Sequence, residues 1–153
     1  SKTYSMTGWR LGYGIFPKNI YSYAEKLAIN CHSCVNSAAQ FAGVEALKGD
    51  QTQVTNMIKE FKLRRDYLVN ELNSIENISC LKPGGAFYVF PKINKNQMNS
   101  AQISKFLLEN KYVATVPGSS FGLNGENFLR VSYASSIKNL KEFILRLRSF
   151  MND

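Results

Sequence analysis

The stretch between Thr52 and Ile75 constrains this chain more than any other, because it contains neither proline nor glycine. Its apolar residues recur every three or four positions, which places them on one side of a helix. We therefore predict one long helix with a buried stripe made of Val54, Met57, Ile58, Phe61, Leu68, Leu72 and Ile75. Because the pattern of residues differs before and after it, this helix is predicted to be the seam between two lobes.

The remaining patterns predict helices and strands in alternation. Before the long helix, we expect a buried strand over Leu11–Phe16, closed by Pro17, and helices over residues 18–30 and 36–48. After it, the expected strands span 78–81, 86–90, 113–116 and 128–133, with a helix over 99–110. A last helix, capped by Ser135 or Ser136, carries apolar residues from Ile137 to Met151. Strands interleaved with helices indicate an α/β or α+β fold.

Composition sets the broad class. The 153 residues, 44% of them hydrophobic, suffice for one ordinary domain or two small lobes. The net charge is +8, but the basic residues are scattered and their densest cluster is diluted by acids, so we expect no nucleic-acid partner. No apolar run reaches the roughly 18 residues of a membrane helix, and the start does not look like a secretory signal. Three cysteines favour a reducing, cytoplasmic location.

One short motif, Cys31-His32-Ser33-Cys34, has the spacing of a metal or redox site. Tetrahedral zinc needs four ligands, usually in two short pairs, and the sequence offers only one further cysteine, Cys80. A thioredoxin-like function would place the motif in a different fold. We therefore expect no metal site, and interpret the motif as two thiols close to a helix start.

The first residues, SKTYSMTGWRLGY, carry dense apolar side chains between glycines, which is unlike a frayed terminus. A lysine amine can hold a carbonyl cofactor as an imine, and an arginine fork suits a phosphate. Lys2 and Arg10 could therefore meet on one phosphorylated aldehyde. A lysine eight residues from an arginine is very common, however, so the spacing alone favours two ordinary surface residues.

Six motifs resemble one enzyme family, in register and in order: SKTYSMTGWRLGYGIFPK, EALKGD, KLRRDYLVNELNSI, CLKPGGAFYVFP, VPGSSFG and FLRVSYASS. Together they are similar to class I (fold type I) pyridoxal-phosphate-dependent aminotransferases, nearest the aspartate and aromatic branch. The resemblance implies an α/β fold. Residues 1–70 would form the C-terminal part of the large cofactor domain, the end of its mixed, mostly parallel sheet, with the long inter-domain helix. Residues 71–153 would form the α+β small domain.

The resemblance assigns three residues to the cofactor, pyridoxal 5'-phosphate. Lys2 corresponds to the catalytic lysine that holds the cofactor as an imine and later moves the substrate Cα proton. Arg10 corresponds to the arginine that grips the cofactor phosphate. Ser1 corresponds to a hydroxyl beside the lysine that reaches the same phosphate.

The resemblance assigns two further residues to the substrate. Arg130 corresponds to the arginine that binds the α-carboxylate with its two-pronged fork; taken alone, it is an outward residue alternating with Leu129 and Val131 on a strand. Gly85 corresponds to a position where a side chain would crowd the substrate, although alone it is a turn glycine. Phe87 and Tyr88 follow as wall or packing residues.

The implied activity is transfer of an amino group between an amino acid, aspartate or aromatic, and a 2-oxo acid, in a cytoplasmic homodimer. Relatives carry the pyridine-nitrogen aspartate and the phosphate loop before the lysine segment. We therefore expect this chain to be a C-terminal portion that does not transaminate by itself. The alternatives are a related pyridoxal-phosphate enzyme, such as a β-lyase, a synthase or a regulator with a similar domain, and a non-catalytic interaction domain.

Overall fold

The computed structural model describes residues 1–95 and 97–153, which form two compact units, Ser1–Met57 and Ile58–Asp153. The long helix α3, Thr52–Asn73, crosses the boundary between these units, so the predicted long helix is confirmed. The chain combines α-helices with short strands in small sheets, which confirms the α/β class. The predicted domains at 1–70 and 71–153 refer to a complete enzyme and stay a prediction.

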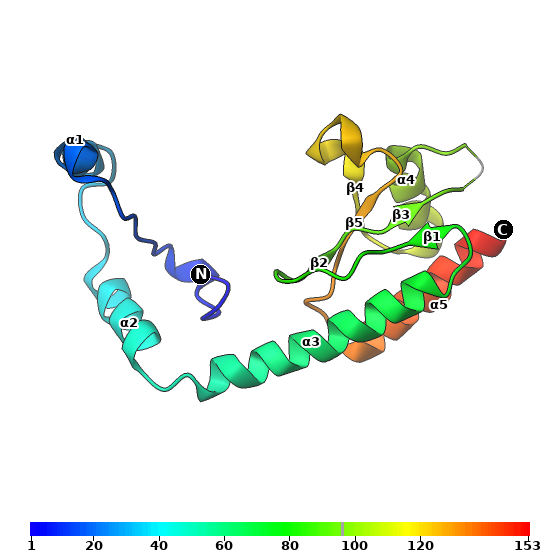
Figure 1. Cartoon of the computed structure of the whole chain (residues 1–153), viewed down its shortest axis with the longest axis horizontal. Helices are drawn as coiled ribbons and strands as arrows, with labels where there is room; N and C mark the ends of the chain where they lie inside the picture. Colours follow the sequence, from blue (N-terminus) through cyan, green and yellow to red (C-terminus); the bar gives the residue numbers. More distant parts are fainter. Residues whose placement is uncertain (96) are drawn as a thin grey trace. The chain divides into compact units, whose positions relative to one another are not determined.

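The first unit consists of helices and irregular chain (Figure 1). A 3₁₀ helix, η1, spans Thr7–Trp9, and two α-helices follow, α1 over Lys18–His32 and α2 over Ser37–Lys48, as predicted. The Asn36 side chain caps α2 by accepting a hydrogen bond from the Ala39 backbone N–H at 3.1 Å. Of residues 1–57, all of which are described, only Ala39 is buried.

The predicted strand over Leu11–Phe16 is wrong, because these residues form no strand in the structure. A strand is stabilised by hydrogen bonds to a neighbouring strand, and residues 1–57 contain no strand that could pair with it. The apolar side chains of the segment are consequently exposed, 81% for Tyr13 and 90% for Ile15.

All strands of the described residues lie in the second unit and pair antiparallel. They are β1 Ile78–Ser79, β2 Tyr88–Val89, β3 Lys92–Ile93, β4 Val116–Pro117 and β5 Leu129–Ser132. β1 pairs with β3, and a three-stranded sheet has the order β2-β5-β4. Four strands fall in or beside the predicted ranges and are shorter. β3 was not predicted, because two residues are too few for an alternating pattern.

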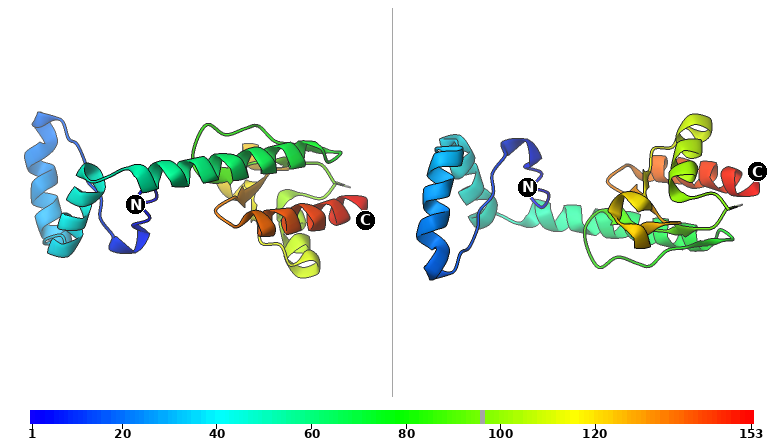
Figure 2. Two further views of the ribbon diagram at one scale, coloured as in Figure 1. Left: turned by 90° about the horizontal axis from the view of Figure 1, so that it is seen from below. Right: turned by 90° about the horizontal axis from the view of Figure 1, so that it is seen from above.

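The core of the second unit lies between this sheet and three helices: α4, Ser100–Lys111, α5, Ile137–Asn152, and the second half of α3. α5 runs alongside that half of α3 in Figures 1 and 2. The predicted stripe of α3 is buried only there, at Leu68 and Leu72, whereas Ile58 is 44% exposed. Ser136 caps α5 by accepting from the Asn139 backbone N–H at 3.2 Å, which selects between the two predicted caps.

Candidate functional site

The segment that carries Ser1, Lys2 and Arg10 is shaped by short-range backbone hydrogen bonds. The Ser1 carbonyl accepts from the Met6 N–H at 2.7 Å, and the Lys2 carbonyl accepts from the Ser5 N–H at 3.2 Å. Arg10 ends η1 in the left-handed region, with φ 52°. All three side chains are exposed, so local turns rather than a core present them.

The side chains of Ser1, Lys2 and Arg10 make few hydrogen bonds or ion pairs within the described residues. The Arg10 guanidinium donates to the Thr7 carbonyl through Nη1 at 3.3 Å. Within the part of the chain that the structure describes, no ion pair involves Lys2 or Arg10. A groove beside Ser1 is walled by apolar residues of the same unit, among them Tyr4, Leu11 and Leu47. Of the three candidate residues, Ser1 lines this groove, and Lys2 and Arg10 are not among its lining residues. An amine, a guanidinium and a hydroxyl are nevertheless the groups that suit a phosphorylated aldehyde chemically.

Arg130 lies on β5, the central strand of the three-stranded sheet, opposite Val116 of β4. Its neighbours Leu129 and Val131 are buried while Arg130 is half-buried, so the predicted alternation is confirmed. The Arg130 Cζ lies 4.5 Å from the centroid of the Tyr88 ring and 5.0 Å from that of the Phe121 ring. No carboxylate among residues 1–95 and 97–153 forms an ion pair with it.

Gly85 lies in the loop that leads from β1 into β2. A Cβ added at Gly84 or at Gly85 would meet no atom within 4 Å. Neither glycine has a positive φ, and the left-handed residue of this turn is Ala86, with φ 61°. Neither the packing of this chain nor the backbone conformation therefore requires glycine at position 85.

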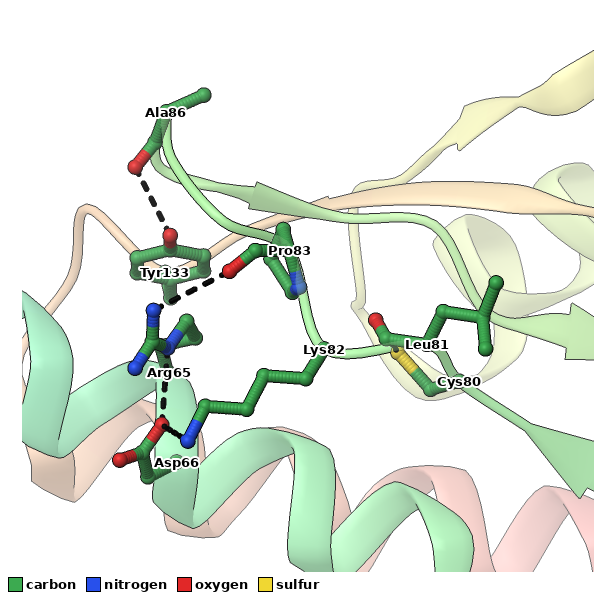
Figure 3. Close-up of polar contacts among 8 residues, drawn as sticks. All are labelled: Arg65, Asp66, Cys80, Leu81, Lys82, Pro83, Ala86 and Tyr133. Carbon is green, nitrogen blue, oxygen red and sulfur yellow. Dashed lines mark hydrogen bonds and ion pairs between the residues drawn. The ribbon is translucent and has the colours of Figure 1, made fainter.

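Two side chains hold the conformation of this loop (Figure 3). The Tyr133 hydroxyl donates to the Ala86 carbonyl at 2.8 Å, and the Tyr133 backbone N–H donates to the Phe87 carbonyl at 2.9 Å. Arg65 of α3 donates to the Pro83 carbonyl at 3.2 Å. These bonds fix the loop on both sides of its glycines, and they explain how Ala86 keeps an unfavourable φ.

Charges at the base of the loop reinforce these bonds. Asp66 accepts from Arg65 at 2.8 Å and pairs with Lys82 at 2.9 Å. The Arg65 hydrogen bond first, and the Lys82 bond second, lower the pKa of the Asp66 carboxyl. Tyr133 is 2% exposed, and burial raises the pKa of its hydroxyl. Sequence analysis did not assign a role at the loop to Arg65, Asp66 or Tyr133, although two of the quoted motifs contain them.

The cysteine motif forms no recognisable centre. Cys31 and Cys34 are exposed free thiols, and Cys80 is buried, which raises the pKa of its thiol. The described residues contain no group of three side chains that could hold a metal ion. In the same residues, no helix combines the length and apolar character needed to cross a membrane.

This chain is similar in sequence to proteins of known family. The family model for aminotransferase class I and II matches residues 1–147. The chain is 40% identical to an aspartate aminotransferase of Pyrococcus horikoshii, over 96% of this chain and 38% of that protein. It is also 40% identical to an aspartate/prephenate aminotransferase of Nitrosomonas europaea, over 99% of this chain and 41% of the relative.

A solved structure also matches this chain closely in fold. The aromatic aminotransferase of Pyrococcus horikoshii superposes with a TM-score of 0.94 and 36% identity, over 99% of this chain and 41% of that one. The chain therefore belongs to the class I and II aminotransferases. It spans about two fifths of the length of the curated relatives it matches.

Proposed function

We propose that this chain is part of a pyridoxal-phosphate-dependent aminotransferase that moves an amino group between an amino acid and a 2-oxo acid. Aspartate or an aromatic amino acid is the proposed substrate, because relatives of both kinds match. One observation carries the proposal: a half-buried guanidinium, Arg130, that has aromatic neighbours and no acidic partner in the described chain. Such a group is suited to bind the carboxylate of an incoming substrate.

The residues of this chain have distinct proposed tasks. Lys2 holds the cofactor through its amine and moves the proton at the substrate Cα; Arg10, with Ser1, binds the cofactor phosphate. Arg130 binds the α-carboxylate with two parallel hydrogen bonds and thereby orients the Cα–H bond. The space beside Gly85 leaves room for the substrate. When bound, the cofactor supplies an electron sink for the charge that develops at Cα.

The test uses the protein produced from its complete coding sequence with pyridoxal phosphate. Lys2→Ala should abolish the absorbance band of the lysine-bound cofactor, and an unchanged band contradicts the assignment. Arg130→Ala should weaken binding of both substrates by about 2–5 kcal/mol, because it removes a desolvated charge partner. Arg148→Ala is the matched control, since Arg148 pairs with Glu71 at 3.1 Å and has no proposed role.

The complete enzyme is further proposed to be a cytoplasmic homodimer, which rests on the resemblance. Sedimentation of the holoenzyme at a monomer mass contradicts this part alone. Release of pyruvate and free ammonia, instead of transfer of the amino group to an acceptor 2-oxo acid, would favour the β-lyase alternative.

A further inference from the structure

We propose that Tyr88 and Phe121 are positioning residues for Arg130: they hold its guanidinium in place and keep its N–H donors available for a substrate carboxylate. This inference rests on the proposed function of Arg130. It starts from the two ring contacts of its guanidinium carbon, at 4.5 and 5.0 Å. Both distances are within the range of a cation–π interaction.

The sheet register determines the first contact. Tyr88 of β2 lies opposite Ser132 of β5, and Val89 lies opposite Val131. Arg130 is two residues from Ser132, so Tyr88 and Arg130 are diagonal neighbours on the same face of the sheet. Cross-strand diagonal pairs are within reach of long and aromatic side chains. Pairing of β2 with β5 therefore brings the ring to the guanidinium.

A tightly packed turn determines the second contact. Phe121 ends the 3₁₀ helix η2, Gly118–Phe121, which follows β4 directly. Gly118 donates its N–H to the Phe128 carbonyl at 2.7 Å, and a Cβ on Gly118 would collide with the Gly125 carbonyl oxygen. The turn thus has little freedom to move, and Phe121 projects from it.

Burial does not account for the position of the Phe121 ring. Its side chain is 52% exposed. It contacts the Phe90 ring edge-on, with centroids 5.9 Å apart, and it contacts Arg130. A large apolar side chain that stays half exposed beside a cation is better explained by that cation than by the core.

Aromatic neighbours suit a carboxylate-binding arginine better than an acidic neighbour would. A carboxylate partner would occupy the N–H donors and neutralise the charge, and the substrate would have to displace it. A ring attracts the cation through its quadrupole and accepts no strong hydrogen bond. The rings also exclude water from part of the guanidinium, which strengthens its attraction to an incoming anion. The two rings should therefore favour the binding of any ligand that carries an α-carboxylate.

The test is kinetic, in the holoenzyme from the complete coding sequence, with aspartate and 2-oxoglutarate as probes. Tyr88→Leu and Phe121→Leu should each raise KM for both probes by about three- to tenfold, the worth of one cation–π contact. Their kcat should change less than about twofold, because the binding lost is common to ground and transition states. Tyr88→Phe keeps the ring and should restore the KM of the parent enzyme.

Phe128→Leu is the matched control, because Phe128 stacks on Phe90 at 5.1 Å and, among the described residues, the rings that make cation–π contacts with Arg130 are those of Tyr88 and Phe121. Replacement of Phe121 by phenylalanines with increasing fluorination keeps the shape of the ring and weakens its quadrupole. KM should then rise with each fluorine, and this series remains informative if a leucine variant fails to fold. A KM that is independent of fluorination overturns the role of Phe121.

A second readout needs no activity. In the holoenzyme, the Arg130 Nε–H proton resonance, identified by its loss in Arg130→Lys, should be shifted by the ring currents. Tyr88→Leu and Phe121→Leu should move it towards the position of an exposed arginine, and an unmoved resonance overturns the inference. If Arg130→Ala impairs carboxylate binding while the ring variants do not, only this inference fails. If Arg130→Ala has no effect, the proposed function of Arg130 fails.

Discussion

The two units of this chain differ in how much of their apolar surface they bury. In Ile58–Asp153, helices and sheets enclose a continuous core that includes Leu68, Ile103, Leu129 and Leu147. In Ser1–Met57, only Ala39 is buried. The first unit leaves large apolar side chains exposed, including Tyr13, Ile15, Tyr23, Leu27, Phe41 and Leu47.

The comparison shows that a unit can form helices without burying a core of its own. Local sequence specifies the helices α1 and α2, and Asn36 caps the second, but helices of their length are marginal in water without tertiary packing. We infer that the first unit depends on apolar surface that residues 1–57 do not supply. The proposed cofactor residues lie on this unit and the proposed carboxylate arginine on the other. The geometry around Arg130 should therefore resist unfolding better than the geometry around the proposed cofactor residues.

The largest expected effect tests whether the core is confined to the second unit. Leu147→Ala should lower the free energy of unfolding of the second unit by about 2–5 kcal/mol, because removal of a fully buried side chain leaves a cavity. Leu27→Ala, on a side chain that is 66% exposed, should change it by less than about 0.5 kcal/mol. Urea denaturation of the 153-residue chain measures both. Equal losses would mean that the two units share one core.

A pair of glycines gives the next effect. Gly118→Ala should destabilise the second unit by about 1–3 kcal/mol, because the added methyl collides with backbone that has no room to move. Gly12→Ala, where a Cβ would meet nothing within 4 Å, should be neutral or slightly stabilising. Thermal unfolding of both variants checks the comparison, and a tolerated Gly118→Ala contradicts the close packing of η2.

A smaller loss is expected at Tyr133. Tyr133→Phe removes the hydrogen bond to Ala86 and should cost about 0.5–1.5 kcal/mol. Burial raises the pKa of the hydroxyl above 10.0, so the folded chain holds this proton more tightly than the unfolded chain. The stabilisation is complete below about pH 10 and is lost as the pH rises through the folded-state pKa. Urea unfolding between neutral and alkaline pH should show this decline, and the variant should show less of it.

The smallest effect concerns two aspartates, one in each unit. Hydrogen bonds lower the pKa of Asp66 below 3.8, so its contribution is present above that value and is lost as the pH falls through the folded-state pKa. The free energy of unfolding of the second unit should decline at low pH, and Asp66→Asn should flatten this acid limb of its pH profile. Asp50 has its pKa lowered by Thr52 at the start of α3, and Asp50→Asn should reduce helix content without changing that limb. An acid limb that Asp66→Asn leaves unchanged argues against the contribution of Asp66, and an unchanged helix content in Asp50→Asn argues against that of Asp50.

The sequence by itself determined the helices and the family. Apolar periodicity located α3 and α5, and the local sequence also placed α1, α2 and α4. The structure then identified Asn36 as the cap of α2 and Ser136, one of the two predicted residues, as the cap of α5. Helices are readable in this way because their hydrogen bonds join residues four positions apart. The motifs named the candidate residues Ser1, Lys2, Arg10, Gly85 and Arg130, whose roles stay proposals.

Only the tertiary structure decided which residues surround Arg130 and the glycine loop. Tyr88 and Phe121 meet Arg130 because strands β2, β5 and β4 pair in that order. Tyr133 reaches Ala86 across 47 positions of sequence. The strand predicted over Leu11–Phe16 is absent because no partner strand pairs with it, and β3 is too short to show a pattern. Strands are stabilised by bonds to distant partners, and a local pattern does not reveal whether such a partner is present.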